Sequence, residues 1–295
     1  MSESKVRNLS FKEMLKLTKT SFKEFIGDDN FLHGAALAYY AIFALVPIIY
    51  LALTTFGSFM GQEQMIIIIS DVMESSMGIE DVSPFTDLMY QWNIGSGGSF
   101  VLKAVGIVVL VFTSTAMFNS LRNSINSFFH IEPIKHYNAI LDNLLKRLVS
   151  FGILALFGLV IIVVYFSQTV LVTLSSNLFS DFTAVEQTII FLIEHISMIL
   201  INFIMFAFIF KYLHDGKIRW KLALGGSLFT SIMLYFGQLL VNYYLSNFFF
   251  AADSGIAGTL LAILTWIFYT SQIIFLGAKF TSVYARMVGM PIVAR

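Results

Sequence analysis

Three polar side chains recur at helical spacing in the segment FNSLRNSINSFF. Asn119, Arg122 and Asn126 stand at positions i, i+3 and i+7, so a helix presents them on one face. A guanidinium can form two parallel bonds to a phosphate or carboxylate, and amides can add further bonds. This pattern favours an anion site for a lipid headgroup. It is equally typical of hydrogen bonds between helices at the point where one of them leaves a membrane.

One lysine lies inside an apolar, aromatic-rich run. Lys279 is the cation of LAILTWIFYTSQIIFLGAKF, where a charge in the middle of a bilayer would cost several kcal/mol. The ammonium can reach headgroups if it lies near the end of a span, or it can meet a partner such as His33, Arg122 or a bound anion. The candidate anion site therefore comprises Asn119, Arg122, Asn126, Lys279 and His33.

A second group of ionisable residues is expected at the opposite side of the membrane. Lys103 and Glu194 would each lie a few residues below the outer end of a predicted span, and His195 follows directly. A pair between Lys103 and Glu194 could act as a gate or a proton-linked switch. In the alternative, each side chain extends separately to the headgroups.

No enzyme, metal or nucleic-acid signature accompanies these residues. The chain lacks the motifs GxxxxGK[ST], HExxH and GxSxG, and its five histidines show no metal-ligand spacing. The cations lie in short connections, not in a basic groove with interleaved aromatics. With no cysteine, thiol ligands are excluded. We therefore expect no catalytic residues, no cofactor, no metal and no nucleic-acid partner.

The composition identifies the scaffold that must position these residues. Of 295 residues, 57% are hydrophobic and 12% are charged, far from the values of soluble domains. Long apolar runs predict an all-α integral membrane bundle, because a helix of about 20 residues crosses the hydrocarbon core. Six transmembrane helices are predicted, at residues 32–58, 99–121, 148–176, 189–212, 222–248 and 256–284.

The segments outside the spans have their own patterns. Residues 1–30 predict an amphipathic helix with Lys12, Lys16, Lys19 and Lys23 on one face, lying on an anionic leaflet or packed against the underside of the bundle. The membrane domain then covers 31–286, and 287–295 form a short tail. A long connection at 62–98 begins with QMIIIISDVMESSM, which predicts an interfacial or re-entrant helix.

The distribution of cations predicts the orientation. Six Lys and Arg precede the first span, four lie in the second connection, four in the fourth, and two follow the last span, whereas the other three connections hold none. By the positive-inside rule, both termini are cytoplasmic and the long connection is external.

Amides and small residues inside the spans predict helix contacts. Five amides are expected to bond across helix pairs: Gln168, Asn202, Gln238, Asn242 and Gln272. Gly34 with Ala38, and Ser254 with Gly258 and Ala262, are spaced for close approach of two helices.

Three stretches resemble the YihY/BrkB family of multipass bacterial inner-membrane proteins. They are DDNFLHGAALAYYAIFALVPI (28–48), TSTAMFNSLRNSIN (113–126) and SGIAGTLLAILTWIFYTSQIIFLGAKFTSVYA (254–285). The resemblance implies six helices in the inner membrane with cytoplasmic termini. Family members typically read LGAE where this chain has Gly277, Ala278 and Lys279. The ribonuclease label once given to the family gains no support, because no acid cluster is present to activate water.

Together these features lead to three functional hypotheses. In the first, the protein binds or translocates a lipid or another anionic amphipathic molecule of the envelope, with membrane lipids as its partners. The second is a structural or assembly factor that docks envelope proteins through residues 62–98. The third, a small-solute efflux carrier, is weakened by the lack of a charge at mid-bilayer. The sequence does not indicate an oligomeric state.

Overall fold

The computed structural model describes residues 9–27, 30–77, 87, 100–131, 184–248 and 256–294. The helices of this part are α1 (Phe11–Gly27), α2 (Asn30–Met60), α3 (Gln62–Met77), α5 (Phe100–Phe128), α7 (Ala184–Tyr212), α8 (Trp220–Phe248) and α9 (Ile256–Met287). Two short strands, β1 (Gly216–Lys217) and β2 (Val293–Ala294), pair antiparallel. The described chain is otherwise helical, as the sequence predicts.

Five of the six predicted spans coincide with helices α2, α5, α7, α8 and α9. Three segments are long and apolar enough to cross a membrane, namely Ala104–Phe128, Trp220–Val241 and Ala257–Met287. The apolar segments Asn30–Leu45 and Met198–Tyr212 are shorter. The predicted span at 148–176 lies outside the described residues.

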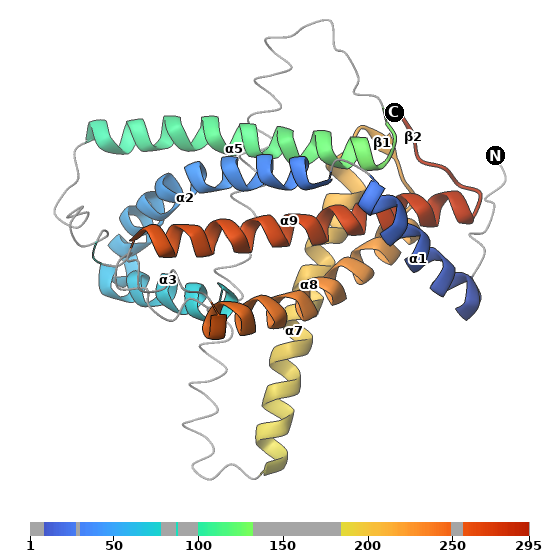
Figure 1. The fold of residues 1–295 in the computed structure, drawn as a ribbon. Coiled ribbons are helices and arrows are strands. Elements are labelled where there is room, and N and C mark those ends of the chain that lie inside the picture. Colours follow the sequence, from blue (N-terminus) through green and yellow to red (C-terminus); the bar gives the residue numbers. More distant parts are fainter. Residues whose placement is uncertain are drawn as a thin grey trace, which may run out of the picture.

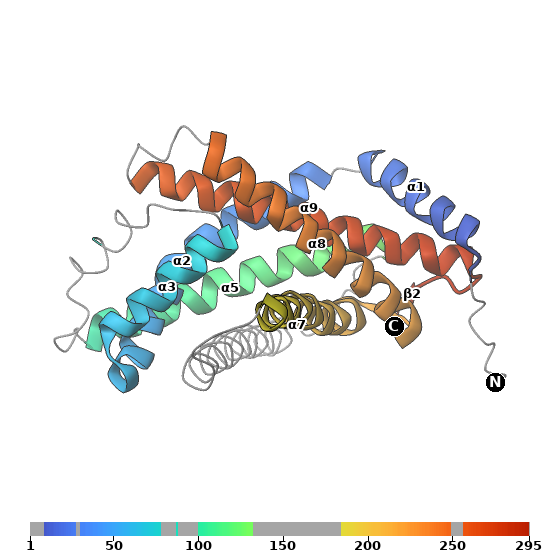
Figure 2. The same cartoon turned by 90° about the horizontal axis from the view of Figure 1, so that it is seen from below.

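The helices form a layered arrangement. Helices α2, α5 and α9 run side by side, α8 packs on α9, and α7 packs on α8 (Figure 1). Helix α7 crosses the others steeply, and its N-terminal half extends away from them, as the two views show (Figure 2). Among the side chains of α7 that the structure describes, those buried lie near its C-terminus, at Phe206, Ala207, Ile209 and Phe210.

The two ends of the molecule differ. Helix α1, the pair β1–β2 and the C-terminal part of α5 lie at one end, which we call the basic end, and α3 lies at the other (Figure 1). Helix α3 contacts α2, α8 and α9, with Met65, Ile66 and Met73 buried. The apolar half of the connection at 62–98 therefore packs on the bundle, and residues 78–99 other than 87 lie outside the described part.

Local signals fix several helix ends. Ser10 N–H donates to Glu13 Oε2 at 2.8 Å, one half of a capping box that starts α1. Helix α9 ends at Met287 and is followed by Gly289, whose φ of 73° is the left-handed conformation in which glycine is least strained. Helix α5 ends at Phe128 in the same way, followed by His130 with φ 56°, and Ile131 N–H donates to Asn126 O at 2.9 Å. A histidine in this conformation is uncommon.

Two of the predicted helix contacts are confirmed. Gln272 Nε2 of α9 donates to the backbone oxygen of Asn30 of α2 at 3.2 Å. A Cβ on Gly34 would overlap Gln272 and approach Ser271 Oγ, so the glycine allows α2 and α9 to come close.

Candidate functional site

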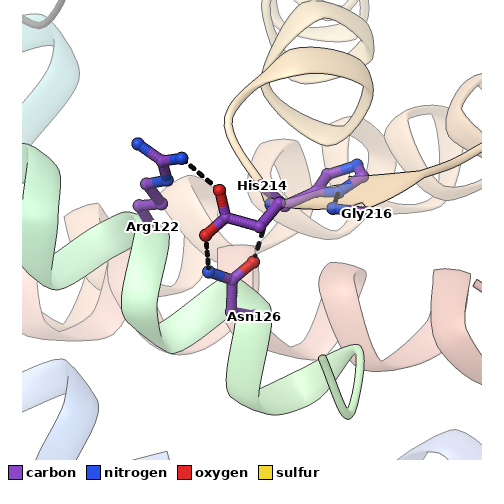
Figure 3. Close-up of polar contacts among 5 residues, drawn as sticks. Arg122, Asn126, His214 and Gly216 are labelled. Atoms are coloured by element: carbon purple, nitrogen blue, oxygen red, sulfur yellow. Dashed lines mark hydrogen bonds and ion pairs between the residues drawn. The ribbon is translucent and has the colours of Figure 1, made fainter. Parts of the chain in front are cut away.

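Asp215 binds two members of the predicted polar stripe. Its carboxylate forms an ion pair with Arg122, and its Oδ2 accepts from Asn126 Nδ2 at 2.7 Å (Figure 3). Asn126 Oδ1 accepts from Asp215 N–H at 2.9 Å, so the amide uses both of its ends on one residue. The connection between α7 and α8 is thereby fastened to α5.

Two further contacts hold this connection in place. His214 Nδ1 accepts from Gly216 N–H at 2.9 Å, which leaves Nε2 to donate to Phe210 O at 2.7 Å. Gly216 and Lys217 pair with Ala294 and Val293, so the predicted tail is joined to the same connection. Asp215 therefore lies in a connection that is held by its own hydrogen bonds and by the β1–β2 pair.

The members of the stripe differ in exposure. Asn126 is 1% exposed, the Arg122 side chain is 28% exposed, and Asn119 lies on the surface. In Figure 3, one guanidinium nitrogen of Arg122 is bonded to the carboxylate and another is directed away from the cluster. The accessible polar groups of the stripe are thus Arg122 and Asn119, while Asn126 is part of the scaffold.

Lys279 lies in a separate group at the same end of the molecule. Its side chain is 1% exposed, with Nζ 3.7 Å from Glu24 Oε2 and 3.3 Å from His130 Nε2. Glu24, on α1, also pairs with Arg286. The ammonium is therefore buried beneath α1, next to Glu24 and His130, two residues that the sequence analysis did not name as its neighbours.

His33 forms a third group. Its Nδ1 lies 2.9 Å from Ser124 Oγ, which donates to Ser120 O at 2.8 Å, so the imidazole Nδ1–H is the donor in the first contact. The ring lies edge-on to Phe128 and Phe275, with centroids 5.5 Å and 6.1 Å away. His33 thus joins α2 to α5 and α9.

The structure shows which predicted neighbours meet. Helix α5 contacts α9, so the helices that carry Arg122 and Lys279 are neighbours. The two cations nevertheless bind different carboxylates, Asp215 and Glu24. Of the predicted outer group, His195 lies edge-on to Tyr235 at 5.8 Å, whereas the side chains of Lys103 and Glu194 lie outside the described residues.

The sequence analysis missed Asp215, Glu24 and His130. A usable signal was present, because Asp215 is an acid in the cation-rich stretch KYLHDGKIRWK and Glu24 follows a row of lysines. An acid among cations at a membrane boundary needs a partner if it is buried.

Comparisons with known proteins place this arrangement in a family. A family model described as virulence factor BrkB matches residues 21–291. A UPF0761 membrane protein of Glaesserella parasuis serovar 5 (strain SH0165) is 23% identical over 188 residues, which cover 62% of each chain. The match therefore spans less than two thirds of that relative, and no solved structure matches the chain. Because the family model covers most of its length, including all the groups above, the chain belongs to the BrkB family of membrane proteins.

Proposed function

We propose that this protein binds an anionic amphipathic lipid, and moves or presents it within the bacterial inner membrane, through a site centred on Arg122. The observation that supports the proposal is the geometry of this arginine. One guanidinium nitrogen is fixed by Asp215, and another is directed away from the cluster, on a side chain that is 28% exposed (Figure 3). A planar donor held in this way can form a bidentate bond to a phosphate.

Asp215 has two consequences for binding. It compensates the positive charge, so recognition rests on the direction of the N–H donors more than on net charge. It also removes rotamer freedom from Arg122 before the ligand arrives, which lowers the entropic cost of binding. Asn119, one turn earlier on α5 and exposed, adds an amide to the accessible side of the site.

Lys279 and His33 form the covered part of the proposed site. Lys279 is held by Glu24 and His130 beneath α1, and His33 is held by Ser124. In the observed arrangement they position helices around the basic end and do not offer donors to the surface. A smaller effect on lipid binding is therefore expected from Lys279→Gln than from changes at Arg122.

The test compares lipids that co-purify with full-length variants. Arg122→Lys retains a cation for Asp215 but lacks the planar fork, so the fold is kept and anionic lipid measured by mass spectrometry falls about tenfold. Asn119→Ala gives a reduction of about fivefold, the value of one neutral hydrogen bond. Lys217→Gln is the matched control, because it removes an exposed cation at the same end without touching the site.

Two results would count against this function. If folded Arg122→Lys protein retains as much anionic lipid as the unaltered protein, the proposed site at Arg122 is wrong. Absence of lipid from the unaltered protein, with an envelope protein co-isolated instead, favours the alternative of an assembly factor that docks partners through residues 62–98.

We further propose that the basic end is cytoplasmic. It carries both described ends of the chain and the connection between α7 and α8, and α3 lies opposite (Figure 1). The chain has no cysteine, so single cysteines report cleanly. In intact cells, an impermeant thiol reagent is expected to label Asp71→Cys on α3 and not Lys217→Cys on β1. The reverse pattern would overturn the orientation.

A further inference from the structure

Helix α1 presents three faces, and only one of them is covered within the described chain. Leu17, Ser21 and Phe25 are buried, and Leu17 packs in one cluster with Phe280 and Val283 of α9. Helix α1 therefore packs on the bundle, which is one of the two arrangements that its amphipathic pattern allows.

The second face is apolar and exposed. Phe11 is 78% exposed, Leu15 58%, Phe22 40% and Ile26 73%. These residues are spaced at i, i+4, i+11 and i+15 and form one stripe along α1. Large apolar side chains gathered on one exposed stripe mark an interaction surface.

The third face borders this stripe and is basic. Lys12, Lys16, Lys19 and Lys23 are all exposed and follow one another at i, i+4, i+7 and i+11. On the helical wheel they lie directly beside Leu15, Phe22 and Ile26. An apolar stripe flanked by lysines is complementary to a lipid surface with acidic headgroups.

The position of α1 along α9 agrees with such a surface. The apolar segment Ala257–Met287 is long enough to cross a membrane, and α1 packs on its last turns, at Phe280 and Val283. Arg286 in the final turn pairs with Glu24. Helix α1 therefore lies at the level where α9 leaves the hydrocarbon, which is the depth of an interfacial helix.

We propose that the exposed stripe of α1 docks on the anionic surface of the membrane in which the chain is embedded. The face with Leu17 and Phe25 stays attached to α9, the stripe enters the headgroup region, and the lysines contact acidic lipids. This surface is distinct from the site at Arg122, so either can fail without the other. A second copy of the chain on the stripe is the competing outcome.

The experiment uses the full chain in nanodiscs of phosphatidylcholine, with or without phosphatidylglycerol. Single cysteines at Leu15 and Phe22 carry a spin label, and Thr20→Cys, on the opposite side of the helix, is the control. With the acidic lipid, labels at 15 and 22 become accessible to oxygen and protected from a water-soluble nickel chelate. The label at 20 stays accessible to the chelate in both lipids.

The lysines are tested on the same labelled chains. Each lysine near an anionic leaflet shifts the ratio of protected to exposed label by about fivefold at low ionic strength. When all four lysines are replaced by glutamine, the labels at 15 and 22 in nanodiscs with phosphatidylglycerol are expected to be as accessible to the chelate as in phosphatidylcholine alone. Added salt is expected to raise the accessibility of these labels in the same way, because it screens the lysines. Labels at 15 and 22 that stay equally water-accessible in both lipids overturn the proposal. Protection from both reagents, with spin–spin broadening, also overturns it in favour of a second copy.

Discussion

Replacing Asp215 by alanine is expected to lower the free energy of unfolding by about 2–3 kcal/mol, because a charged hydrogen bond is lost and the buried amide of Asn126 loses its acceptor. The carboxylate side chain is 10% exposed and meets both Arg122 and Asn126. Its loss leaves the guanidinium without its counter-charge and the buried Nδ2 of Asn126 without its acceptor. In the variant these donors are still removed from water on folding, but the hydrogen bonds to Asp215 that compensated this cost are lost.

A double-mutant cycle separates this contact from a general effect on the connection. Unfolding in mixed detergent micelles is measured for Asp215→Ala, Arg122→Met and the double variant. The double variant is expected to lose clearly less than the sum of the two single losses, because it removes both charges. Lys217→Ala, two residues from Asp215 and exposed, is the control and should change little. Simple additivity would show that the two side chains do not act as a pair.

The long apolar helices were predictable because their signal is local. An apolar window of about 20 residues predicts a helix from its own composition, and α2, α5, α7, α8 and α9 each contain a predicted range, except that α5 begins one residue after its range does. The span predicted at 99–121 lies on a helix that continues to Phe128, in agreement with the helical spacing of Asn119, Arg122 and Asn126. Asp215 binds Asn126 and Arg122, so the polar end of this helix can pack against the connection between α7 and α8.

The sequence could mark Asp215 and Glu24 as acids in need of a partner, but which residues they pair with was not predictable, because the partners come from distant parts of the chain. Asp215 reaches α5 across 93 residues in sequence from Arg122, and Glu24 reaches Lys279 from the N-terminal helix. No periodicity reports such a contact. For α1, the sequence left open whether the helix lies on a lipid surface or packs on the bundle. Its apolar face is wide enough to pack against α9 and still leave a stripe of apolar side chains exposed.

A repeated pattern between α8 and α9 leads to the second large effect. Gly226-Ser-Leu-Phe-Thr230 on α8 and Gly277-Ala-Lys-Phe-Thr281 on α9 share the form GxxFT. A Cβ on Gly226 would overlap Thr281 Oγ1, and a Cβ on Gly277 would overlap Thr230 Oγ1. Phe229 and Phe280 stack with centroids 4.1 Å apart and planes 4° apart. The two helices therefore interlock through reciprocal contacts, each threonine lying against the glycine of the other helix.

Gly226→Ala is expected to destabilise the protein by about 1–2 kcal/mol. Overpacking against Thr281 costs about 1–3 kcal/mol, and the higher helix propensity of alanine returns up to about 1 kcal/mol. Adding Thr281→Ala should restore most of the loss, because it removes the overlapping atom. The Thr281 hydroxyl donates to Gly277 O within its own helix at 2.8 Å, so its removal leaves no buried donor without a partner.

The control uses the threonine that faces the other glycine. Gly226→Ala with Thr230→Ala should show no rescue, because Thr230 lies against Gly277. Gly277→Ala should in turn be rescued by Thr230→Ala and not by Thr281→Ala. Equal rescue by either threonine substitution would mean that these variants act by loosening the packing of α8 on α9 in general.

Since Lys279 lies between Gly277 and Thr281, the contact between α8 and α9 also fixes the turn of α9 that directs the ammonium towards Glu24 and His130. Variants that separate α8 from α9 are therefore expected to weaken the attachment of α1 as well.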